Sequence, residues 1–193
     1  MKKTDNHNLR AKLELRRYFL SAAKFSKPIS VCDCFSGSEV IWGTLAKEFE
    51  VGNYLALDVK AKRGRLKLDS IRYLENQEWT HDVVDLDAYG SPWRHLFEVC
   101  KRMAGPNGPG KCLVFLTIGN TIWKQQQAEA LAQVGIPFDL PPAIEGQLAD
   151  LILDSCLAAP LDFGLSIEEA AEALNPGGSA RYIGIQICQK KPS

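Results

Sequence analysis

The sequence predicts an α/β domain built on a doubly wound, mostly parallel sheet. Short apolar runs of strand length alternate along the chain with segments whose apolar residues recur at helical spacing. The runs are apolar without interruption, which is typical of strands that helices cover on both faces. With 193 residues, of which 46% are hydrophobic, the chain can form one good core, so we expect a single domain over residues 1–193.

The predicted elements follow one another regularly as far as the strand at 112–116. A first helix over 9–23 belongs to a basic N-terminal segment, 1–28, and Pro28 ends it. The other predicted helices are 40–49, 71–74, 93–103, 125–133, 147–158 and 166–174, and the predicted strands are 29–35, 54–57, 83–84, 112–116 and 180–188. The helix at 166–174 opens like a capping box. Residues 120–165 are expected to form a helical insertion that acts as a lid, a recognition lobe or a partner surface.

Charge is distributed unevenly, although the net charge is zero. Residues 1–28 hold eight Lys or Arg against two acidic residues, and residues 60–67 hold five with no acid. Residues 125–180 have no Lys or Arg and nine acidic residues. The two basic segments predict a polyanionic partner such as nucleic acid. Ordinary solvated helix faces are the alternative.

Other features limit the class of protein. No stretch reaches the roughly 18–20 unbroken apolar residues of a membrane span, and the first residues lead into a charged segment, so we expect a soluble, cytoplasmic protein with no membrane partner. The six cysteines form no CxxC pair and are predicted to be reduced core thiols, so no metal site is expected. His7, His81 and His95 are scattered, which favours structural or solvated roles. The oligomeric state stays open.

Ligand-binding signals lie where three predicted strands end. In doubly wound sheets the ligand lies beyond the carboxyl ends of the strands. Gly37 follows the first strand in a turn, Asp58 ends the second strand 21 residues later, and Asp69 follows a short apolar stretch. An acidic residue at that spacing commonly binds ribose hydroxyls. The three positions together predict a nucleoside-containing cofactor.

The turn after the first strand favours S-adenosylmethionine over NAD. A dinucleotide site needs G-x-G-x-x-G to bring backbone amides onto the pyrophosphate. Here Glu39 stands at the second glycine position, and its carboxylate would repel a pyrophosphate. S-adenosylmethionine has no phosphate and carries positive charge, so a nearby carboxylate does not repel it. A nicotinamide-dependent oxidoreductase remains as a third hypothesis.

The motifs also resemble those of known enzymes. Asp33-x-Phe35-x-Gly37 is similar to the first motif of Rossmann-type class I S-adenosylmethionine-dependent methyltransferases, Asp58 to the second, and Asp69 to the acidic residue that holds the adenine amino group. Residues 85–92, Asp-Leu-Asp-Ala-Tyr-Gly-Ser-Pro, resemble the Asp-x-Asp-Pro-Phe/Tyr-Gly-Ser-Pro segment of the tRNA guanine-N2 dimethyltransferase family. The resemblance covers about residues 29–118. It implies cofactor-binding residues at Asp33, Phe35, Gly37, Asp58, Asp69, Ser70 and Asp85.

This chain departs from the family at three points. Ala88 replaces the proline of the loop, Glu39 replaces a glycine, and the chain has no room for the large C-terminal domain of the family. The first departure raises the question of how rigid the loop is, and the last bears on the tRNA substrate. A binding or regulatory module with weakened catalysis is therefore the second hypothesis.

The resemblance implies methylation of an exocyclic amine on a nucleic-acid base, with tRNA or other RNA favoured over DNA, and the chemistry of the loop suits such an amine. Such an amine must be oriented because its lone pair is delocalised into the ring. The carboxylate of Asp87 and the carbonyl of Ala88 can accept its hydrogens, and Tyr89 can stack on the base. Asp85 is expected to orient the loop or face the methionine ammonium group. The structural alternative for the whole segment is an Asx turn that leaves a strand, with the aromatic residue in the core. The expected substrate-binding residues are Gly90, Ser91, Pro92, Thr117 and Asn120.

Overall fold

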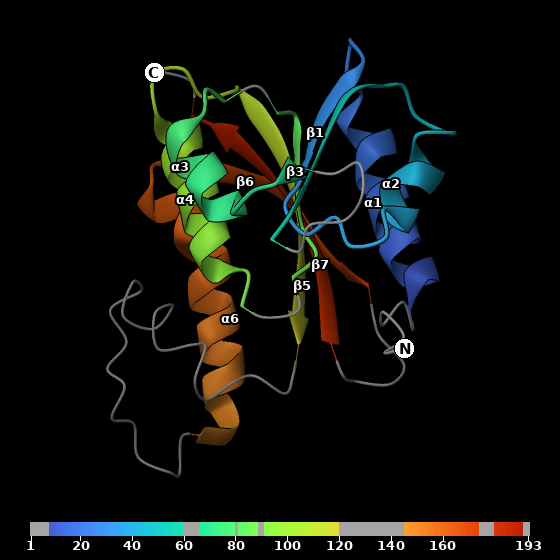
Figure 1. The fold of residues 1–193 in the computed structure, drawn as a ribbon. Helices are drawn as coiled ribbons and strands as arrows, with labels where there is room; N and C mark the ends of the chain where they lie inside the picture. The colour runs from blue at the N-terminus through green and yellow to red at the C-terminus, as the bar shows by residue number, and fades with distance from the viewer. Residues whose placement is uncertain are drawn as a thin grey trace.

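Seven strands form one sheet in the part of the chain that the structure describes, which comprises residues 8–59, 66–79, 81–88, 91–119, 145–173 and 180–190 of a computed structural model. Their order is β3-β2-β1-β4-β5-β7-β6 (Figure 1). Strands β1 to β5 are parallel, whereas β7 runs antiparallel to β5 and β6. The strands are β1 (Ile29–Asp33), β2 (Val51–Asp58), β3 (Leu66–Lys67), β4 (Val83–Leu86), β5 (Lys111–Gly119), β6 (Leu165–Ala173) and β7 (Ala180–Gln189). The predicted doubly wound, mostly parallel sheet is confirmed.

Helices cover both faces of this sheet. On one face lie α1 (Leu9–Ala23) and α2 (Val40–Leu45) (Figure 1). On the other lie α3 (Ser70–Asn76), α4 (Trp93–Ala104) and α6 (Glu145–Asp162). Two apolar clusters correspond to these two layers. No described helix is both long enough and apolar enough to cross a membrane.

Alternation along β4 decides which side chains meet which helices. Val83 packs with the cluster under α1 and α2, whereas Val84 and Leu86 pack with the cluster under α4. Because successive side chains of a strand point to opposite faces, Asp85 lies on the same face as Val83. The carboxylate of Asp85 is therefore directed at the α1 layer, which supplies its partners.

Helix α1 lies close to the sheet because β7 has a glycine beneath it. A Cβ atom built on Gly184 would lie 2.4 Å from Cε2 of Phe19, so a larger residue would collide with this ring. Phe19 is fully buried and packs edge-to-face on Phe115, with ring centroids 5.8 Å apart. This contact holds α1 where its polar side chains reach the ends of the strands.

The predicted helix at 166–174 is wrong. Most of this segment lies in β6, which pairs with β7 along its length and contains a register shift between Ile167 and Glu169. A capping box stabilises a helix only slightly, whereas pairing with β7 satisfies the backbone hydrogen bonds of both strands. Gly164, with a φ of 73°, makes the turn into β6 from α6.

The late helical insertion is described only in part. The predicted helix at 147–158 falls within α6, which packs on α4 and β6, whereas the predicted helix at 125–133 lies outside the described residues. The role of 120–165 as a lid or recognition lobe stays a prediction. All six cysteines are free and buried, as predicted.

Candidate active site

The loop after β1 lies between the ends of its two neighbouring strands. The backbone N–H of Ser36 donates to the carbonyl of Leu57 in β2 at 3.1 Å, and the N–H of Cys34 donates to the carbonyl of Asp85 in β4 at 3.0 Å. These bonds bring the Gly37 turn beside the carboxyl end of β2, where Asp58 is half-buried. The predicted neighbourhood of Gly37 and Asp58 is therefore present.

The Gly37 turn also shows what one departure from the family pattern costs. Gly37 and Glu39 have φ values of 48° and 58°, in the left-handed region that glycine adopts readily. A glycine at position 39 would take this conformation without steric cost, whereas Glu39 takes it with strain on the order of 1–2 kcal/mol. Glu39 directly precedes α2, so the strain is local to the turn.

A second group of residues gathers around His95, in the first turn of α4. The Nε2 atom of His95 lies 2.9 Å from Oγ of Ser70, and its ring lies 4.8 Å from the ring of Phe35, between centroids. Beside it, Asp69 caps α3 by accepting the N–H of Ile71 at 3.0 Å. His95 thus joins two of the predicted cofactor residues. The sequence predicted only a structural or solvated role for His95, because its separation from Ser70 by 25 residues leaves no local signal.

Two buried polar atoms near these loops have no hydrogen-bond partner in the described part of the chain, namely Oγ of Ser36 and Nδ1 of His95. Buried polar groups are normally paired, so such atoms commonly mark a place for a ligand or water. Burial lowers the pKa of His95 to about 4, which keeps the imidazole neutral near pH 7. A neutral imidazole can donate or accept a hydrogen bond to a ligand.

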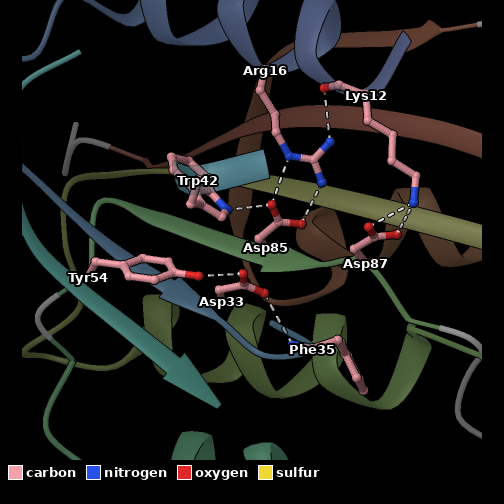
Figure 2. Close-up of polar contacts among 8 residues, drawn as sticks. All are labelled: Lys12, Arg16, Asp33, Phe35, Trp42, Tyr54, Asp85 and Asp87. Atoms are coloured by element: carbon pink, nitrogen blue, oxygen red, sulfur yellow. Dashed lines mark hydrogen bonds and ion pairs between the residues drawn. The ribbon is translucent and has the colours of Figure 1, made fainter. Parts of the chain in front are cut away.

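Three carboxylates, Asp33, Asp85 and Asp87, lie at the carboxyl ends of β1 and β4. Asp33 and Asp85 are register partners, and both are almost fully buried (Figure 2). Asp33 accepts hydrogen bonds from the hydroxyl of Tyr54 at 2.9 Å and from the N–H of Phe35 at 3.3 Å. Burial, together with the charge of Asp85, raises the pKa of Asp33 well above its ordinary value. The neutral form of Asp33 is therefore more favoured here than it would be in water.

Asp85 is enclosed by donors from the helical layer. Arg16 of α1 binds it through Nε and Nη2 at 2.7 and 2.6 Å, and the indole N–H of Trp42 in α2 donates to it at 2.7 Å (Figure 2). The side chains of Arg16 and Asp85 are each 1% exposed. Because both oxygens of Asp85 accept from the protein, its contacts favour orienting the loop over binding a cofactor ammonium group.

Asp87 follows β4 and is paired in the same way, but it stays more accessible. Nζ of Lys12 lies 2.6 and 2.7 Å from its two oxygens (Figure 2). The side chain of Asp87 is 19% exposed and that of Lys12 is 7% exposed. Burial raises the pKa of Asp87, but the charges of Lys12 and Arg16 and the hydrogen bonds from Lys12 outweigh it, so this pKa lies below its ordinary value.

The two ion pairs fit because the repeats of the helix and the strand match. Lys12 and Arg16 are four residues apart on α1, a rise of about 6 Å. Asp85 and Asp87 are two residues apart on an extended chain, a rise of about 6.6 Å. Equivalent positions on the two elements therefore coincide, and each cation lies over one carboxylate. The guanidinium of Arg16 also lies 4.9 Å from the ring centroid of Phe115.

The rest of the predicted substrate loop is described in part. The hydroxyl of Ser91 accepts the N–H of Trp93 at 3.5 Å, and Pro92 directly precedes α4. Thr117 is buried near the end of β5 and pairs in register with Tyr182 of β7. Three predicted or basic segments lie outside the described residues: Tyr89 and Gly90, Asn120, and 60–65.

The basic N-terminal segment is not wholly a surface feature. Lys12 and Arg16 are buried in ion pairs with the strand ends, so they cannot contribute to a nucleic-acid surface. Arg17 pairs with Glu48 at 2.6 Å, whereas Lys24 and Lys27 are exposed. Among the described residues, no group of three or more His, Cys, Asp or Glu side chains is arranged to hold a metal ion.

Comparison with known proteins identifies the fold. No protein-family model and no curated protein matches the sequence. Solved structures do match, and one is Trm1 from Pyrococcus horikoshii in complex with S-adenosyl-L-methionine, with a TM-score of 0.64 and 12% identity over 94% of this chain and 54% of that chain. This chain has the class I methyltransferase fold. It spans about half the length of the Trm1 chain.

Two further solved structures match most of both chains. The plantazolicin methyltransferase BamL has a TM-score of 0.60 and 11% identity, covering 96% of this chain and 88% of that chain. M. jannaschii TYW2 in complex with AdoMet has a TM-score of 0.54 and 11% identity, covering 98% of this chain and 79% of that chain. At these identities the likeness establishes the fold alone.

Proposed function

We propose that this protein is an S-adenosylmethionine-dependent methyltransferase that N-methylates an exocyclic amine of a nucleic-acid base, with tRNA or other RNA favoured over DNA. The observation that carries the proposal is the Asp87 carboxylate. It lies at the carboxyl edge of a methyltransferase fold, stays 19% exposed, and has a lowered pKa, so it is an ionised acceptor at neutral pH.

The proposed cofactor site is the edge formed by the Gly37 turn, Asp58 and Asp69. Bound S-adenosylmethionine would supply an electrophilic methyl group. Asp58 is suited to the ribose hydroxyls and Asp69 to the adenine amino group, since its second oxygen is not used in capping α3. The unpartnered Oγ of Ser36 and Nδ1 of His95 add two polar atoms at this edge. The other proposed cofactor residues are Asp33, Phe35 and Ser70, whereas Asp85 is proposed to orient the loop because Arg16 and Trp42 occupy its oxygens.

On the substrate side, Asp87 and the carbonyl of Ala88 would each accept a hydrogen from the amine. These bonds direct the nitrogen lone pair at the methyl group and stabilise the positive charge that develops on nitrogen. Tyr89 would stack on the base. Gly90, Ser91, Pro92, Thr117 and Asn120 are the proposed residues of the surrounding pocket.

The nucleic-acid substrate is supported by two features. Residues 85–92 resemble a loop of the tRNA guanine-N2 dimethyltransferase family, and residues 60–67 hold five basic residues with no acid. The N-terminal segment supports it less, because two of its basic residues are buried. Electrostatic binding of this kind weakens steeply as salt rises. Binding of bulk tRNA that does not change between low and high salt would count against a nucleic-acid substrate.

The function is tested by cofactor binding and methyl transfer. Calorimetry should detect binding of S-adenosylhomocysteine and no binding of NAD. The reverse result would favour an oxidoreductase. Labelled methyl transfer to bulk tRNA, DNA and protein should favour tRNA. Asp87→Asn should reduce transfer about 100-fold and leave S-adenosylhomocysteine affinity unchanged. Equal transfer by the variant would remove Asp87 from the mechanism, and cofactor binding with no transfer to any acceptor would favour a regulatory module.

A further inference from the structure

The Asp87 loop holds its shape without the proline of the related family. The N–H of Ala88 donates to the carbonyl of Leu86 at 2.8 Å, closing a three-residue turn around Asp87. Proline has no N–H and could not form this bond. A backbone hydrogen bond therefore fixes the Asp87 turn in place of a proline ring. Because this bond does not orient the Asp87 side chain, the side chain needs a contact that anchors it separately.

Lys12 is that anchor. Its ammonium group is buried, contacts both oxygens of Asp87, and lies 5.1 Å from the ring centroid of Tyr182. A buried ammonium group is costly unless it is paired, so the pair and the position of α1 depend on each other. Contacts to both oxygens also define the plane of the carboxylate, which a single hydrogen bond would leave free to turn.

The anchor leaves Asp87 able to accept further hydrogen bonds. A carboxylate has about four lone-pair sites, and Lys12 contacts each oxygen once. The neighbouring Asp85 differs, because it takes three donors and is 1% exposed, against 19% for Asp87. Of Asp85 and Asp87, only Asp87 can be bound by a cation of α1 and still accept a hydrogen bond from a ligand.

We infer that Lys12 is a positioning residue that holds the Asp87 carboxylate in the orientation needed to accept the substrate amine. The inference rests on the proposed function, and it makes α1 part of the active site. Lys12 does not touch the reacting atoms. Its expected effect is on the rate of transfer and not on cofactor affinity.

The first experiment compares three variants in labelled methyl transfer to bulk tRNA. Lys12→Met keeps the length of the side chain and removes its charge, and Lys12→Arg keeps the charge. Lys101→Met is the control, since Lys101 lies on α4, outside both basic segments, with 66% of its side chain accessible. Lys12→Met should lower kcat about 100-fold, with S-adenosylhomocysteine affinity unchanged. Lys12→Arg should recover most of the rate. A kcat of Lys12→Met equal to that of Lys101→Met overturns the inference.

A second experiment needs no methyl acceptor, so it stays informative if transfer to tRNA fails. Carbon-13 NMR titration of the Asp87 carboxyl group should give a higher pKa in Lys12→Met than in the wild type, because burial remains while the main compensating charge is lost. Lys12→Gln, which also removes the charge, serves the same purpose if Lys12→Met does not fold. An unchanged pKa overturns the inference. Methylation of Lys12 itself, seen by mass spectrometry of the wild type with S-adenosylmethionine, also overturns it, because Lys12 would then be an acceptor.

Discussion

The two faces of β4 carry opposite chemistry. On the face toward α4, Val84 and Leu86 are fully buried among apolar side chains. On the face toward α1, Asp85 is equally buried, but it is matched by Arg16 and Trp42. One strand therefore provides packing on one side and a set of ion pairs on the other. Apolar packing and charge pairing are separated by a single residue step along the chain.

The faces also divide the proposed active site. Phe35, Ser70 and His95 are grouped on the α4 side, where the cofactor is proposed to bind. The ion pairs Arg16–Asp85 and Lys12–Asp87 are grouped on the α1 side, where the amine is proposed to bind. Substitutions on the two sides should therefore separate cofactor affinity from methyl transfer.

The largest effect on stability is expected from Arg16→Met. The variant leaves Asp85 buried without its cation, which should lower the free energy of unfolding by about 3–5 kcal/mol. Urea unfolding measures the loss. The double variant Arg16→Met with Asp85→Leu, which replaces the pair by apolar side chains, should recover most of it. A loss under about 1 kcal/mol for the single variant would mean that the pair is solvated.

Leu86→Ala is the matching change on the apolar face. Removing a fully buried leucine side chain should cost about 3 kcal/mol in the free energy of unfolding. Because Leu86 points away from α1, the pKa of Asp87 should stay the same in a carboxyl NMR titration. A shift of that pKa would show that the two faces are coupled.

A smaller effect is expected from His95 and depends on pH. The pKa of His95 is about 4 in the folded state, below its ordinary value near 6.5 in the unfolded state. Its contribution to stability is therefore fully present above pH 6.5 and is lost as pH falls toward 4, by an amount on the order of 1–3 kcal/mol. Urea unfolding of wild type and His95→Phe between pH 7.5 and 4.5 measures the difference. A wild-type curve parallel to that of the variant would contradict this assignment.

The smallest effect is expected from Glu39→Gly. Glycine takes the observed φ of 58° without the strain that Glu39 bears, so the variant should gain about 0.5–1 kcal/mol in the free energy of unfolding. Gly37→Ala is the opposite change in the same turn and should destabilise the protein. A loss of stability in Glu39→Gly would mean that the interactions of the Glu39 side chain outweigh its backbone strain.

Local patterns predicted much of this protein. Apolar runs located the central strands, and the polar residues after them located the edge at which Gly37, Asp58, Asp69 and Asp87 lie. The strand at 165–173 was missed because its backbone is satisfied by β7, a partner that no local pattern reveals. His95 was missed as a site residue for the same reason, since Phe35 and Ser70 come to it from other loops.

The pairing of charges depended on tertiary structure. Basic residues at helical spacing in α1 were visible in the sequence and indicated a surface for nucleic acid, yet Lys12 and Arg16 are buried against Asp87 and Asp85. Spacing along a chain defines which side chains share a face, because the helix and strand repeats are constant. Which face meets which is decided by packing, here by Phe19 against Gly184 of β7, far away in the sequence. The carboxylates were thus predictable from the chain, and their partners were not.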